Sequence, residues 1–177
     1  MNGTQGRFQL RTVALGALVA ISCLGWTQDT HAGAKGTDRP MVGSCDTEVT
    51  PKSPPGEVPI ILAIDLTCRL THLGLTTGGT DREVVVPAGP PNGSALPIAI
   101  VIETITYIAA NGDKLKSMFA GQGSIDLATG KAIFFGTETF NGGTGRFRNA
   151  TGSSQTSGEA SLLTNKGFLT ISGSVNY

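Results

Sequence analysis

Within residues 60–72 one parity is an apolar row, and the other parity is polar at Asp65, Thr67, Arg69 and Thr71. The residues of one parity are Ile60, Leu62, Ile64, Leu66, Cys68, Leu70 and His72. Successive side chains of a β-strand point to opposite faces, so this pattern predicts a long strand with one buried face. His72 ends the apolar row, and we expect it to be a hydrogen-bonded residue near the end of the strand.

Six further segments are predicted as strands, and most of the connections between them are short turns. They cover residues 80–86, 98–109, 114–122, 131–140, 153–164 and 168–177, and an eighth strand is possible at 46–50. Asn111-Gly112 gives a strong hairpin signal because both residues tolerate positive φ. We expect an all-β fold, an antiparallel meander closed into a roughly eight-stranded barrel, because closure removes exposed strand edges.

The segment 98–109 differs from the others because its apolar residues occur on both parities. Ile100 and Ile102 share one parity, whereas Val101 and Ile105 share the other. A strand that is apolar on both faces is normally covered on both faces. In a small domain with no predicted helix the second cover could be another subunit, so this segment hints at a homo-oligomer.

The first 32 residues have the form of a secretory signal peptide. Arg7 and Arg11 precede an apolar run at 12–22, and residues 30–32 (Thr-His-Ala) offer small side chains at a cleavage site. The run is too short to span a bilayer, which takes about 20 apolar residues, so we expect no membrane span. The sequence before Cys23 loosely resembles a bacterial lipobox. Lipid anchoring at Cys23 is therefore an alternative to a freely secreted or periplasmic protein.

Cleavage after residue 32 would leave Cys45 and Cys68 as an even pair. In an oxidising compartment two such thiols most simply form one disulfide. Residues 33–56 are rich in Pro and Gly, and we expect them to form a leader over the surface, tied down through Cys45. The barrel domain is predicted at residues 57–177.

Charge and composition bear on three kinds of partner: nucleic acid, metal ions and cofactors. The chain has 13 Lys and Arg against 13 Asp and Glu. A nucleic-acid partner is not expected, because neutralising phosphates requires a basic surface. The Cys pair and His72 are too few for a metal site, and no motif indicates a cofactor.

The segment 141–152 (NGGTGRFRNATG) is rich in glycine and admits two interpretations. A phosphate-binding loop would sit between a strand and a helix, but no Gly-Lys-Ser/Thr follows and the next residues resemble a strand. We favour a tight corner between strands. In that corner the glycines take positive φ and Phe147 plugs the barrel end.

This segment also carries a family resemblance. It is similar to the signature of the dirigent and allene oxide cyclase superfamily, as found in bacterial secreted members, through the residues Gly142, Gly143, Thr144, Gly145, Arg146, Phe147 and Gly152. Residues 71–74 (Thr-His-Leu-Gly) and 110–115 (ANGDKL) resemble two further elements of that family. The resemblance implies an eight-stranded antiparallel barrel, commonly trimeric in the plant members. It does not imply activity, because the matched residues are those of turns and packing.

Glu103 and Glu138 are the acidic residues that lie inside strongly apolar strands. If both pointed into the barrel, their pKa values would be raised and they could do acid–base chemistry. We favour the alternative in which both face solvent or a subunit interface. No catalytic residue is assigned, and Glu103, Glu138 and His72 are the candidates for the lumen.

The leading functional hypothesis is an exported, non-catalytic barrel that binds a small apolar ligand or serves as a structural or interaction module. The rival is an allene oxide cyclase-like isomerase or a dirigent-like stereo-directing protein. A cavity of about 300 Å³ or more, lined by these candidates, would favour the rival or a ligand binder. A barrel filled with Ile, Leu and Phe would leave a structural role.

Overall fold

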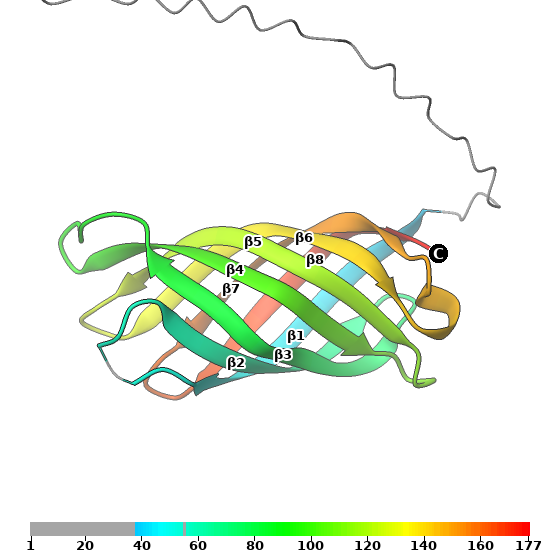
Figure 1. Ribbon diagram of the computed structural model, residues 1–177, viewed down its shortest axis with the longest axis horizontal. Coiled ribbons are helices and arrows are strands. Elements are labelled where there is room, and N and C mark those ends of the chain that lie inside the picture. The colour runs from blue at the N-terminus through cyan, green and yellow to red at the C-terminus, as the bar shows by residue number, and fades with distance from the viewer. Residues whose placement is uncertain (1–37, 55) are drawn as a thin grey trace, which may run out of the picture. The chain divides into compact units, whose positions relative to one another are not determined.

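The computed structural model describes residues 38–54 and 56–177, so the predicted signal peptide and Cys23 lie outside the described residues. Eight strands follow one another as β1 (Arg39–Pro51), β2 (Ile60–Leu70), β3 (Gly74–Pro87), β4 (Ala95–Ile108), β5 (Lys114–Asp126), β6 (Lys131–Gly143), β7 (Thr151–Ser161) and β8 (Lys166–Asn176). Each strand pairs antiparallel with the next, and β1 pairs with β8 (Figure 1). The predicted all-β, closed eight-stranded barrel is confirmed.

The first strand corrects the predicted leader. Residues 33–56 are predicted to lie over the surface, but β1 is a barrel strand that pairs with β2 through Gly43–Pro51 and with β8 through Arg39–Glu48. Its inward row includes Met41, Cys45 and Val49, which are buried, with Gly43 and Thr47 between them. Because Gly43 and Thr47 are not apolar, the inward row of β1 does not show the apolar–polar alternation that predicts a strand. The barrel therefore begins near residue 39 instead of 57.

Cys45 and Cys68 form the predicted disulfide. They lie directly opposite each other in the register of β1 and β2, with their Cα atoms 3.9 Å apart. Both side chains are buried in the barrel interior. The covalent link therefore fixes the pairing of β1 with β2 from inside.

The two-sided apolar pattern of β4 has a local cause. Ile102 pairs with Phe119 and Ile105 pairs with Ser117, so Glu103 and Thr104 together oppose one residue of β5. This is a β-bulge, which exchanges the inward and outward parities of a strand. Ile102 faces inward before the bulge and Ile105 faces inward after it. The bulge explains the inward position of Ile105, whereas Val101 faces outward and is 49% exposed. A homo-oligomer stays a prediction.

The two barrel ends differ. The closed end is where β2, β4, β6 and β8 finish, and the open end is where β1, β3, β5 and β7 finish (Figure 1). Phe147, which is fully buried, plugs the closed end and packs edge-on against Tyr177, with ring centroids 4.7 Å apart. The glycine-rich segment forms the predicted corner: Gly142 and Gly145 have φ of 104° and 56°. A short 3₁₀ turn at Gly145–Phe147 carries Phe147 over the end.

Candidate functional site

The barrel encloses a cavity of about 90 Å³ that is walled almost entirely by apolar side chains. We call it the lumen cavity. Its wall includes Val49, Leu62, Ile100, Phe119, Phe134 and Leu169, contributed by six different strands. Leu162, which follows β7 at the open end, also lies on the wall and is 38% exposed.

Glu138 projects from β6 into the lumen cavity and is only 1% exposed. Its carboxyl group accepts hydrogen bonds from four hydroxyl groups. Thr156 and Ser154 donate from β7 at 3.3 Å and 3.5 Å, Ser117 donates from β5, and Tyr107 donates from β4. All four donors are buried, so this is a connected polar network inside an apolar barrel.

Burial sets the titration of this network. Desolvation raises the pKa of the Glu138 carboxyl above its ordinary value of 4.5, while the hydrogen bonds from Ser117 and Tyr107 act in the opposite direction. Burial and the neighbouring Glu138 carboxylate raise the pKa of the Tyr107 hydroxyl well above its ordinary value. Tyr107 therefore stays protonated and remains a hydrogen-bond donor to Glu138.

A second carboxyl group, Glu83 on β3, also lines the lumen cavity and is 7% exposed. Within residues 38–54 and 56–177 no group donates a hydrogen bond to its side chain. Burial raises the pKa of Glu83 from 4.5 to about 7. Sequence reasoning missed this residue.

The reason for the omission is a second bulge. Leu62 pairs with Glu83 and Ile64 pairs with Thr80, so Asp81 and Arg82 together oppose one residue of β2. Thr80 lines the cavity before the bulge, and Glu83, three residues later, lines it afterwards. A strict period of two would have placed Glu83 on the outside. The signal in the sequence for the inward orientation of Glu83 is that it shares its parity with the apolar Val85, which is buried.

The register relates the two acids. Glu83 pairs with Ile102, Ile102 with Phe119, and Phe119 with Glu138, so all four lie in one row across β3 to β6. Phe119 stands between the acids in this row. Space for its ring comes from Gly136, where a Cβ would lie 2.7 Å from the tip of the Phe119 ring.

Glu103 does not belong to the site. It faces solvent beside the β4 bulge and forms an ion pair with Arg82 at 3.4 Å, with both side chains largely exposed. The favoured interpretation, that both acids of the sequence-derived pair face outward, is right for Glu103 and wrong for Glu138. Glu138 lies on β6 and points inward with Phe140, two residues later. The bulge in β4 changes the orientation of residues in β4 and leaves β6 unchanged.

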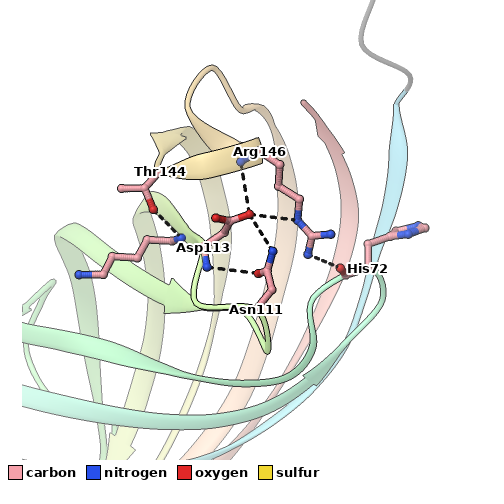
Figure 2. Close-up of polar contacts among 6 residues, drawn as sticks. His72, Asn111, Asp113, Thr144 and Arg146 are labelled. Carbon is pink, nitrogen blue, oxygen red and sulfur yellow. Dashed lines mark hydrogen bonds and ion pairs between the residues drawn. The ribbon is translucent and has the colours of Figure 1, made fainter.

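His72 lies outside the lumen as well. It occupies the turn between β2 and β3 with a φ of 64°, and its side chain is exposed. Figure 2 shows the imidazole pointing away while the backbone carbonyl accepts a hydrogen bond of 2.8 Å from the Arg146 guanidinium. His72 thus supports the closed end through its backbone and not through its ring.

Arg146 joins three turns of the closed end. Its guanidinium lies 3.9 Å from the Asp113 carboxylate of the β4–β5 hairpin and stacks over the Phe147 ring, 4.7 Å from the centroid. Asn111 donates a further hydrogen bond to Asp113 at 2.9 Å (Figure 2). The residues of the family-like motif therefore stabilise the closed end of the barrel. The carboxyl groups of Glu83 and Glu138 lie in the lumen cavity instead.

Comparison with known proteins adds no relative. No protein-family model, curated protein or solved structure matches this chain. The resemblance to the dirigent and allene oxide cyclase superfamily therefore remains a prediction from the sequence motifs.

Two further features bear on the chemistry. In the part of the chain that the structure describes, no cluster of three His, Cys, Asp or Glu side chains could hold a metal ion. None of the described helices has the length and apolar character needed to cross a membrane. The wall of the lumen cavity carries two carboxyl groups, hydroxyl groups and many apolar side chains.

Proposed function

We propose that this protein is an exported binding barrel whose lumen holds a small, largely apolar ligand. The observation that carries the proposal is Glu83, a buried carboxyl group that faces an apolar cavity without a hydrogen-bond partner among the described residues. Burying such a group costs free energy and does nothing for packing. Departures of this kind from good core design are expected at functional sites.

The size of the cavity limits the ligand. About 90 Å³ is well below the 300 Å³ at which volume alone would favour a ligand binder, and it is also smaller than a cavity of roughly 150 Å³ that binds benzene. The proposal therefore rests on the buried carboxyl group of Glu83 and not on the volume of the cavity. A molecule of about five non-hydrogen atoms, or the end of a longer chain that enters past Leu162, fits this volume. Export is part of the proposal because the buried disulfide suits an oxidising compartment.

A second candidate function is acid–base catalysis, as in the isomerases of the superfamily that the motifs resemble. The observation that favours it is the proton-holding network of Glu138 and Tyr107, which lines the same cavity as Glu83. Binding is preferred because four hydroxyl groups already occupy the Glu138 carboxyl group. Conversion of a bound molecule, seen as a new compound in the solution, would favour the catalytic candidate.

The binding proposal is tested by titrating the protein with 1-butanol and following backbone and methyl NMR signals. We expect saturable shifts for lumen residues in the millimolar range or tighter. Ala132 lines the cavity, so Ala132→Leu should fill it and abolish the shifts, while Ala120→Leu on the exposed face should keep them. Shifts that do not saturate, or that survive in a folded Ala132→Leu protein, would contradict lumen binding.

A further inference from the structure

We infer that the ligand of the lumen is an apolar amine, whose ammonium group pairs with the Glu83 carboxylate while its hydrocarbon part occupies the cavity. The inference rests on the proposed binding function and names the chemical class of the ligand. It is carried by three features of the cavity: the sign of its charges, the difference between its two acids, and the distribution of its apolar wall.

The charges in the cavity have one sign. Glu83 from β3, Glu138 from β6 and Tyr107 from β4 are the titratable side chains on its wall, and no Lys, Arg or His lies among the described lining residues. The inward residues of β2 and β4, the two strands that pair with β3, include no other titratable group on this wall. Arg82, next to Glu83 in sequence, is on the outside with Glu103. An anionic ligand would thus meet two acids and no cation, which is unfavourable in a region of low dielectric.

The two acids are not equivalent. Glu138 is surrounded by the hydroxyl groups of Tyr107, Ser117, Ser154 and Thr156, so its lone pairs already have donors. Glu83 has no such donor, and an ionised carboxylate there needs a partner from outside the protein. An ammonium group supplies three donors and the opposite charge, which together offset the cost of burial.

The apolar wall explains where the rest of the ligand lies. Glu83 is four residues from the end of β3 at the open end, and Ile60, Val85 and Leu62 are close to it in the register or in sequence and line the same cavity. An ammonium group held at Glu83 leaves the alkyl part against these aliphatic side chains. A small inorganic cation or a polyamine would leave that wall in contact with water or with charge, so an amine with a single apolar tail fits best.

The test compares three probes of one chain length: butylamine, 1-butanol and butyrate, titrated at pH 8 with NMR detection. Butylammonium should bind about tenfold more tightly than 1-butanol or better, and butyrate should bind most weakly. Glu83→Gln keeps the shape of the side chain and should remove the preference for the amine while 1-butanol still binds. The matched control, Glu103→Gln, changes an exposed acid outside the barrel and should keep the preference.

The pH dependence gives a second readout. Butylamine stays protonated between pH 5 and pH 8, whereas Glu83, with a pKa of about 7, is ionised at pH 8 and protonated at pH 5. Binding of the amine should therefore weaken roughly ninetyfold from pH 8 to pH 5, because only the ionised fraction is competent. Binding of 1-butanol should change far less.

The outcomes separate the two claims. If 1-butanol binds but the amine shows no preference, or if Glu83→Gln keeps that preference, the amine inference is wrong and lumen binding stands. If none of the three probes gives saturable lumen shifts, the proposed function and the inference both fail.

Discussion

Glu83 and Glu138 show how neighbours decide the behaviour of the same side chain in one cavity. Glu138 lies among hydroxyl donors, and their hydrogen bonds oppose, without cancelling, the rise in its pKa that burial causes. Glu83 has the same apolar wall without the donors, and desolvation alone raises its pKa to about 7. Glu138 therefore has hydrogen-bond donors for its carboxyl group, and Glu83 is the acid that has none among the described residues.

The raised pKa of Glu83 predicts a loss of stability with rising pH. The folded protein holds this proton more tightly than the unfolded chain, so the penalty is absent below pH 4.5, grows between pH 4.5 and 7, and is complete above pH 7. It amounts to roughly 3 kcal/mol. Urea unfolding at pH 4.5 and pH 8 should show wild type losing about this much more than Glu83→Gln. Equal pH dependence in the two proteins would place Glu83 in solvent.

At the scale of strands, the bulges of β3 and β4 place Glu83 inside the lumen and leave Glu103 outside it. Their effects could not be read from the sequence, because a bulge has no fixed composition and exchanges the inward and outward parities within one strand. This is why Glu83 was missed, why Glu103 was paired with Glu138, and why β4 suggested a second subunit. Strands β2 to β8, the Asn111-Gly112 hairpin and the Phe147 plug were predictable because turn residues and alternation specify them locally, whereas β1 was predicted as a leader.

The glycine-rich corner gives a prediction about backbone conformation. Gly145 has a φ of 56°, and a Cβ there would collide with the Asp113 carboxylate; Gly112 has a φ of 85° with open space around it. Gly112→Ala should cost about 1–2 kcal/mol for the left-handed conformation alone. Gly145→Ala should cost more, since it also displaces Asp113 from Arg146. Chemical denaturation of both variants measures the difference, and equal losses would contradict the steric argument.

The contacts of Arg146 predict that its removal lowers the stability of the protein more than removal of the nearby Arg148. Arg146→Ala removes the hydrogen bond to the His72 carbonyl, the contact with Asp113 and the stacking on Phe147, and it should lower the free energy of unfolding by about 1–2 kcal/mol. Arg148 is exposed, and its side chain makes none of these contacts. Arg148→Ala should therefore stay within about 0.5 kcal/mol of wild type. A similar effect of both substitutions would show that Arg146 does not join the turns.

At the scale of the whole molecule, the residues that stabilise the fold and the residues of the proposed site occupy different parts of the barrel. The motif that most resembles a known family seals the closed end, and the acids lie along one row of the interior that reaches toward the open end. The closed meander followed from the alternation and the short turns. The lumen cavity did not, because its volume depends on how inward glycines such as Gly136 and large residues such as Phe119 combine across neighbouring strands.

The most direct measurement is the pKa of the Glu83 side chain, followed by ¹³C NMR in protein with labelled glutamate and assigned with the Glu83→Gln variant. The account predicts a midpoint near pH 7 in the ligand-free barrel, and a lower midpoint when butylamine is present, because the ammonium group stabilises the carboxylate. A midpoint near 4.5 that butylamine leaves unchanged would place Glu83 in water and contradict the proposed site.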